Sequence, residues 1–161
     1  MTLPEHTIRR ITAEETHAIR RAVLRPGRPA EETVYPGDEQ ATTIHLGAFF
    51  GTRLTGVATL TREPCPWQGQ DEDWRLRGMA VVGEERGRGV GGTLMTRAIS
   101  EAGRAGGRVL WCHGRTTARS FYERHGLQAR GEEFESPQTG PHYLFLLDLD
   151  AVQTAAPATA G

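Results

Sequence analysis

A glycine-rich stretch between a strand-like run and a helical pattern constrains the fold of this chain more than any other feature. The run Met79–Val82 is apolar, the stretch Glu85–Thr93 contains four glycines, and apolar residues recur at helical spacing after it. The glycines therefore lie where a strand passes into the N-terminus of a helix. The first turn of a helix presents unpaired N–H groups and the positive end of the helix dipole, and glycine lets an anion approach them closely. We expect an anion-binding loop here, with Arg86 and Arg88 adding positive charge.

The loop is compatible with more than one kind of ligand. Gly87–Gly92 satisfies the dinucleotide-binding pattern G-x-G-x-x-G. A dinucleotide fold also carries an acidic residue about 20 residues later, at the end of the next strand, and this chain has Trp111–Gly114 there. A P-loop ends in Gly-Lys-Ser/Thr, but Gly92 is followed directly by Thr93 and all 19 basic residues of the chain are arginine. The residues therefore disfavour a nicotinamide dinucleotide and exclude a P-loop, while a flexible connection without a ligand remains an alternative.

Two motifs occur in the order that one enzyme family uses. The segment Arg86–Gly91 fits the signature R/Q-x-x-G-x-G/A, and Ala118–Leu127 looks like the pattern A-x-x-F-Y-x-x-x-G-F. On these residues the chain resembles the GNAT N-acetyltransferase superfamily, over Trp74–Leu149. The resemblance implies an α/β fold of the α+β kind. Its central mixed, mostly antiparallel sheet would have about seven strands, with helices on both faces.

Patterns along the chain predict the same order of elements. The expected strands are His6–Ile11, Thr43–Phe50, Leu54–Thr61, Trp74–Val82, Val109–Cys112, a strand that begins at Leu127, and Tyr143–Leu149. The expected helices follow the capping box Thr12–Glu15, run from the glycine loop to Gly106, and cover Arg115–His125. The segments Arg62–Asp73 and Phe134–Pro141 contain turn formers and are expected to be loops. We expect a single domain over residues 1–150 and a disordered tail at residues 151–161.

Composition disfavours several classes of protein. With a formal net charge of −1 over 161 residues, the chain has no overall basic field for nucleic acid. Its two cysteines and six scattered histidines form no metal-ligand pattern, so no metal is expected. The sequence shows neither an apolar run long enough to span a membrane nor a secretion leader, which favours a cytoplasmic protein. The apolar last strand, Tyr143–Leu149, is a candidate surface for a homodimer.

The resemblance implies acetyl-CoA as the acetyl donor and assigns its site to two segments. In the family, the pyrophosphate lies on backbone N–H groups of the glycine loop, and pantetheine pairs like an extra strand with Met79–Val81. A backbone N–H of Met79 or Val81 would then stabilise the oxyanion that develops on the thioester. Arg115 stands where many members carry an asparagine that touches the cofactor. The cofactor-binding residues expected from the resemblance are Met79, Ala80, Val81, Arg86, Gly87, Arg88, Gly89, Val90, Gly91, Gly92, Thr93, Arg115 and Phe121.

The resemblance also implies direct attack of an amine on the thioester, without a covalent enzyme intermediate. Tyr122 matches the tyrosine that often protonates the departing thiolate, and the alternative is that it is an aromatic core residue. Cys112 is expected to be structural. The glutamate that some members carry on the fourth strand is absent from Trp74–Arg77. The general base therefore stays open among Glu72, Asp73, His113 and a relayed water.

The acceptor side carries weaker signals. Candidate acceptor-site residues are His45, His113 and His142, although a lone histidine is more often structural. The four basic residues Arg20, Arg21, Arg25 and Arg28 form either a solvated helix face or an anionic acceptor site. The predicted function is an N-acetyltransferase that acts on a primary amine of a small molecule or a protein. The alternative is a noncatalytic acyl-CoA-binding module, which the missing base favours and Tyr122 disfavours.

Overall fold

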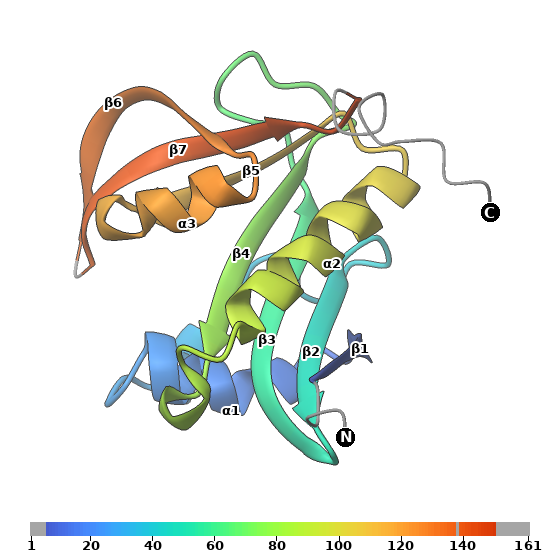
Figure 1. Cartoon of the computed structure of the whole chain (residues 1–161), viewed down its shortest axis with the longest axis vertical. Coiled ribbons are helices and arrows are strands. Elements are labelled where there is room, and N and C mark those ends of the chain that lie inside the picture. Colours follow the sequence, from blue (N-terminus) through green and yellow to red (C-terminus); the bar gives the residue numbers. More distant parts are fainter. Residues whose placement is uncertain (1–5, 138, 151–161) are drawn as a thin grey trace. The chain divides into compact units, whose positions relative to one another are not determined.

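The computed structural model describes residues 6–137 and 139–150, which form a seven-stranded mixed sheet with helices (Figure 1). The strand order is β1-β2-β3-β4-β5-β7-β6. The pair β4–β5 is parallel, whereas β1–β2, β2–β3, β5–β7 and β6–β7 are antiparallel. The predicted fold class, a mixed and mostly antiparallel sheet of about seven strands, is therefore confirmed.

Most element positions agree with the sequence patterns. The strands are β1 Thr7–Ile11, β2 Ile44–Phe50, β3 Arg53–Arg62, β4 Trp74–Val81, β5 Val109–Arg115, β6 Gln128–Ser136 and β7 Gly140–Asp148. The α-helices are α1 His17–Ile19, which continues as a π-helical segment over Arg20–Leu24, α2 Val90–Arg104, and α3 Arg119–Arg124. Short 3₁₀ segments cover Glu14–Thr16, Ala30–Thr33, Gly83–Glu85 and Thr116–Ala118.

The predicted capping box begins the first helical region. The Thr12 N–H donates to Glu15 Oε1 at 2.9 Å, and the Glu15 N–H donates to Thr12 Oγ1 at 3.2 Å. Two N–H groups that the helix start would leave unpaired are thus satisfied reciprocally. The helical region therefore begins where the sequence predicts it.

The described residues group into two compact units. The first contains those of Met1–Thr61 and Leu76–Ala98, and the second contains those of Arg62–Arg75 and Ile99–Gly161. In the first unit, the neighbours Gly56 and Val57 of β3 point to opposite faces of the sheet. Val57 packs with Ile19 of α1 in a buried cluster. A Cβ on Gly56 would lie 3.0 Å from Leu94 Cδ1 of α2, so helices cover both faces of this part of the sheet.

In the second unit, both faces of the sheet around β5 and β7 are also covered. The neighbours Leu144 and Phe145 of β7 point to opposite faces. Leu144 packs with Trp111 and with Cys65 from the loop that follows β3. Phe145 stacks on Tyr122 of α3, with ring centroids 4.5 Å apart, and Figure 1 shows α3 beside β7. One face is thus covered by a helix and the other by a loop.

A buried carboxylate fixes the loop on that second face. Asp73 Oδ2 accepts the Cys65 N–H at 3.0 Å and the Gln70 N–H at 2.8 Å. Asp73 Oδ1 also pairs with Arg108 Nη2 at 2.9 Å, and the Asp73 side chain is fully buried. The predicted loop Arg62–Asp73 is therefore a loop from Glu63 onward, since Arg62 still belongs to β3, and it is anchored by its own last residue.

Two expectations about the C-terminal strands are wrong. The sequence predicts a turn over Phe134–Pro141, but β6 continues to Ser136 and β7 begins at Gly140, with Phe134 opposite His142. Pairing can continue because Pro141 lies near the start of its strand, where a missing N–H is tolerated. The last strand is not an edge for a second copy either, because β7 lies between β5 and β6. The predicted disordered tail at residues 151–161 lies outside the described residues.

Candidate active site

The glycine loop forms the predicted helix N-terminus in the first unit. After β4, the Val82 N–H donates to the Thr55 carbonyl at 2.9 Å, and the chain turns through Gly83–Glu85. Gly87 and Gly89 both have φ of +80°, a left-handed conformation that side chains rarely adopt. A Cβ on either glycine would meet no other atom within 4 Å, so this side of the loop is open.

Helix α2 starts directly after these glycines. The Thr93 N–H donates to the Gly89 carbonyl at 3.0 Å, which is the first bond of the helical pattern. The N–H groups of Val90, Gly91 and Gly92 precede it and have no partner within the helix ladder. Val90 itself is 2% exposed and packs against Gly56 of β3, so its side chain anchors the start of the helix to the sheet. The loop therefore has the geometry of an anion site.

The charged side chains around the loop differ in burial. Arg86 and Arg88 are exposed, and Arg88 Nη1 lies 3.8 Å from Glu85 Oε2. The Glu85 carboxylate is buried and also lies 3.9 Å from Arg53 Nη1. Glu85 thus connects the loop to Arg53 at the start of β3, while the side chains of Arg86 and Arg88 are exposed.

The β4 segment expected to meet pantetheine lies in the same unit. Gly78 lies within β4 and has φ of +63°, a left-handed conformation that is unusual in a strand. After it, Met79 and Val81 are half-buried, and Ala80 packs with Ile19 in the core. The parallel register of β4 with β5 covers Trp74 and Arg75, which come before this segment.

Tyr122 lies in the second unit, where it contacts two aromatic rings and a cysteine. Its ring stacks on Phe145 at 4.5 Å and meets Phe121 edge-on at 5.4 Å. Its hydroxyl interacts with the buried Cys112 thiol. Burial, followed by the neighbouring Cys112, raises the pKa of Tyr122 well above its usual value. Tyr122 therefore stays protonated at neutral pH, as a proton donor must be.

Burial also raises the pKa of the Cys112 thiol, to about 12. A thiol is nucleophilic only as its thiolate, and Cys112 is 3% exposed. Its environment fits the structural role that the sequence suggests.

Gly114 is the residue of β5 that makes room for the Tyr122 ring. A Cβ on Gly114 would lie 2.3 Å from Tyr122 Cε2 and 2.9 Å from Phe145 Cδ2. Gly114→Ala is therefore expected to lower the free energy of unfolding by about 1–3 kcal/mol, because both rings must shift. Urea denaturation measures this change. Gly83→Ala is the control, since a Cβ there meets nothing within 4 Å, and an equal loss in both variants would contradict the prediction.

The other residues assigned to the cofactor or acceptor lie in different places. In the second unit, β5 pairs Arg115 with His142 of β7. Arg115 is exposed, and His142 is 8% exposed with Nδ1 2.8 Å from the Gly140 carbonyl. His113 is exposed, with its ring 5.4 Å from Trp111 and 5.2 Å from Phe134. The ends of β5, β6 and β7 thus bring His113, Arg115 and His142 together.

His45 is separate from that group. It lies in the first unit, 6% exposed, with Nδ1 2.8 Å from Thr59 Oγ1 and Nε2 2.9 Å from the Asp38 carbonyl. Both ring nitrogens are therefore engaged by protein groups. This geometry is that of a structural histidine.

The candidates for the general base differ in availability. Asp73 is fully buried and accepts the loop-fixing bonds described above. Glu72 is exposed, and its carbonyl accepts the Arg108 N–H at 3.0 Å. His113 stays exposed next to aromatic rings. The structure therefore uses Asp73 for folding and leaves Glu72 and His113 open to solvent.

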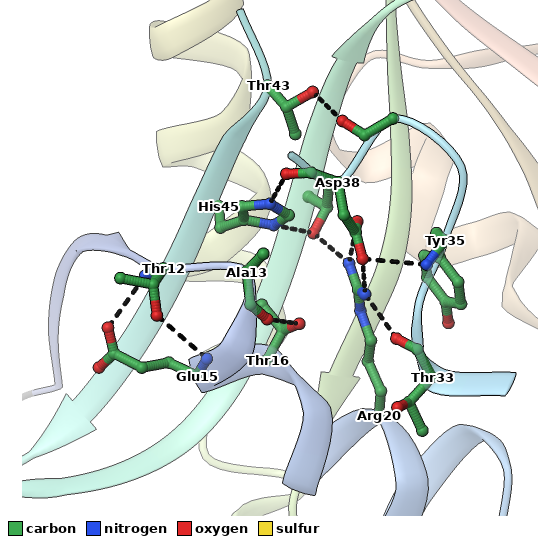
Figure 2. A network of polar contacts seen from close by, with 12 residues as sticks. Thr12, Ala13, Glu15, Thr16, Arg20, Thr33, Tyr35, Asp38, Thr43 and His45 are labelled. Atoms are coloured by element: carbon green, nitrogen blue, oxygen red, sulfur yellow. Dashed lines mark hydrogen bonds and ion pairs between the residues drawn. The ribbon is translucent and has the colours of Figure 1, made fainter. Parts of the chain in front are cut away.

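Arg20 is the residue that the sequence interpretation missed, because neither a solvated face nor an acceptor site describes it. Its side chain is fully buried and pairs with Asp38 through Nη1–Oδ2 at 2.7 Å and Nη2–Oδ1 at 3.1 Å (Figure 2). It also donates to the Thr33 carbonyl and to Thr59 Oγ1, each at 2.8 Å. No local pattern marks this role, since the partners lie 18 and 39 residues away.

The neighbouring basic residues remain at the surface. Arg21 is exposed, and Arg28 pairs with Glu32 at 2.7 Å. Arg21 also borders a pocket of about 420 Å³ in the first unit. The pocket lies between α1 and the segment Ala30–Val34, and Glu31 lines it as well. Of the four arginines proposed as an acceptor site, Arg21 is thus the one that lines this pocket.

Comparisons with known proteins agree with this geometry. Residues 11–127 match the model of the acetyltransferase (GNAT) family. An uncharacterized N-acetyltransferase of Bacillus subtilis, YitI, is 30% identical over 135 residues, which are 84% of this chain and 91% of YitI. The chain therefore belongs to the GNAT acetyltransferase family.

Solved structures share the fold at low sequence identity. Escherichia coli ElaA matches with a TM-score of 0.74 and 15% identity, over 89% of this chain and 99% of ElaA. FeeM, an N-acyl amino acid synthase from uncultured soil microbes, matches with a TM-score of 0.73 and 14% identity, over 94% and 95% of the two chains. These likenesses establish the architecture.

The family implies an acyl-CoA donor. Within residues 6–137 and 139–150, no cluster of three or more histidine, cysteine or acidic side chains could hold a metal ion. Over the same part of the chain, no helix is long and apolar enough to cross a membrane.

Proposed function

We propose that this protein transfers an acetyl group from acetyl-CoA to a primary amine of a small molecule or a protein. The observation that carries the proposal is the open loop before α2, where Gly87 and Gly89 adopt φ of +80° directly ahead of the helix N-terminus. A diphosphate fits such a site because the N–H groups and the helix dipole both favour negative charge. Arg86 and Arg88 add two exposed positive charges.

The chain's own groups would share the chemical work as follows. Backbone N–H groups at Gly91 and Gly92 would hold the pyrophosphate of acetyl-CoA, which supplies the activated acetyl thioester. N–H groups of Met79 or Val81 would bind the developing oxyanion. Tyr122, a protonated phenol at neutral pH whose pKa is raised by burial, would give a proton to the departing sulfur. The amine attacks the thioester carbonyl, the C–S bond breaks, and the amine's extra proton leaves through a base such as Glu72, His113 or water.

The binding step is tested with a pair of glycine variants. Gly89→Val places a side chain in the open loop and is expected to abolish acetyl-CoA binding in calorimetric titration. Gly106→Val is the matched control, because Gly106 has the same φ of +80° and an equally open Cβ position at the other end of α2. The wild type and the control should be stabilised by about 2.7 kcal/mol at 100 times the dissociation constant. Equal affinity in all three proteins, or saturable binding of NAD in place of acetyl-CoA, would contradict the proposed loop.

The chemical step is tested by following free thiol release from acetyl-CoA with a panel of amino acids, polyamines and short peptides. A noncatalytic acyl-CoA-binding module is the second candidate, and the sequence Trp74–Arg77 favours it because β4 carries no carboxylate. That candidate predicts acetyl-CoA binding without thiol release for any amine. The structural likeness to FeeM, an N-acyl amino acid synthase, makes longer acyl-CoA donors worth including in the same panel.

A further inference from the structure

A column of stacked side chains lies against the irregular point of β4 in the first unit. The guanidinium carbon of Arg20 lies 3.9 Å from the centroid of the Tyr35 ring, and that of Arg77 lies 4.4 Å from it. The ring also touches β4, because a Cβ on Gly78 would lie 2.9 Å from Tyr35 Cε2. The same Cβ would lie 3.4 Å from Arg20 Nε. The left-handed backbone at Gly78 is therefore packed directly against Tyr35 and Arg20.

The buried polar network in Figure 2 fixes Arg20 and Tyr35 in this column. The Asp38 carboxylate accepts hydrogen bonds from Arg20 Nη1 and Nη2, and it also accepts the Tyr35 N–H at 2.9 Å. Thr59 of β3 accepts from Arg20 Nη2 at 2.8 Å, and its hydroxyl also meets His45 Nδ1 at 2.8 Å. Arg20 and Tyr35 thus have little freedom to move relative to β3 and the loop that follows Ala30–Thr33.

We propose that Tyr35, fixed by Arg20 and Asp38, is a positioning residue for acetyl transfer. It holds the backbone at Gly78, and Gly78 sets the direction of the next N–H group, that of Met79. This inference rests on the proposed function, in which Met79 or Val81 binds the developing oxyanion. A hydrogen-bond donor must be placed closely for that role, since a misplacement of about 1 Å can cost about 100-fold in rate.

Two substitutions of Tyr35 separate positioning from other roles. Tyr35→Leu removes the ring that contacts Gly78 and both guanidinium groups, and kcat with the best amine of the panel is expected to fall about tenfold or more. The dissociation constant of acetyl-CoA should stay within a few-fold, because the loop Arg86–Thr93 is not touched. Tyr35→Phe keeps the ring contacts and should restore kcat to within about twofold of the wild type. A residue needed only for folding would not give this split between kcat and affinity.

Amide hydrogen exchange gives a readout that does not depend on turnover. Tyr35→Leu should speed exchange at Met79 and Ala80, while Leu46 and Ala48 in β2 exchange as in the wild type. If Tyr35→Leu does not fold, Thr59→Val replaces the hydroxyl that joins Arg20 to His45 with a methyl group, and the same split between kcat and affinity is expected.

Three results would overturn the positioning role. The first is an unchanged kcat in folded Tyr35→Leu or, if that variant does not fold, in Thr59→Val. The second is an unchanged exchange rate at the Met79 amide. The third is a loss of kcat in Tyr35→Phe as large as in Tyr35→Leu. Failure of the proposed function is distinct from these, because the wild type itself would then release no thiol from acetyl-CoA with any amine of the panel.

Discussion

Replacing Arg20 with methionine is expected to lower the free energy of unfolding by about 3–5 kcal/mol, because it leaves the buried carboxylate of Asp38 without its partner. Asp38 is 5% exposed and Arg20 is fully buried, so water cannot take over the broken bonds. The other bonds of Arg20, to Thr33 and Thr59, are lost at the same time. Urea denaturation monitored by circular dichroism measures the change.

The adjacent residue provides the matched control for this substitution. Arg21→Met removes the same charge from an exposed position and should change stability by no more than about 0.5 kcal/mol. The double variant Arg20→Met with Asp38→Leu removes both charges and should recover part of the loss, because no ion is left buried alone. Similar losses of unfolding free energy in Arg20→Met and Arg21→Met would contradict the stabilising role that we assign to the buried Arg20–Asp38 pair.

The same pair should make stability depend on acid pH. Burial raises the pKa of Asp38, but hydrogen bonds from Arg20 and from the Tyr35 N–H outweigh it, so the pKa in the folded protein is lowered. A lowered carboxyl pKa contributes stability that is fully present above the unfolded value of about 3.9 and is lost as pH falls through the folded value. Asp38→Asn should therefore flatten the stability profile below about pH 4.

Tyr122→Phe is expected to slow acetyl transfer by about 100-fold, at the low end of the range for a positioned general acid because a thiolate already leaves readily. The ring contacts with Phe145 and Phe121 are kept, so acetyl-CoA affinity should stay within a few-fold. Because burial raises the pKa of Tyr122, the wild-type rate should not fall through tyrosine ionisation between about pH 7 and 9.5. Steady-state thiol release across this pH range measures the effect.

Cys112 supplies the control for this second substitution. Cys112→Ala removes the thiol that interacts with the Tyr122 hydroxyl but leaves the hydroxyl itself. If the amine attacks the thioester directly, this variant should keep its rate within a few-fold of the wild type. Complete loss in Cys112→Ala would point to a covalent route, and an unchanged rate in Tyr122→Phe would assign the tyrosine to the core.

The sequence by itself determined the features that depend on contiguous residues. The glycine loop ahead of α2 could be predicted because strand, glycines and helix follow one another along the chain, and the left-handed conformation at Gly87 and Gly89 is a local property of glycine. The capping box Thr12–Glu15 could be predicted for the same reason, since its two hydrogen bonds span three residues. The family motifs likewise occupy two short segments.

Only the tertiary structure decided which polar side chains are buried and what they contact. Arg20 and Arg21 are adjacent and chemically identical, yet one is fully buried and the other exposed. The difference arises because Arg20 meets Asp38 and Thr59, which lie 18 and 39 residues further along the chain. The place of β7 between β5 and β6 is likewise a matter of topology. Such contacts cannot be read from the sequence pattern, because desolvation of a charge is offset only by partners that folding brings from distant segments.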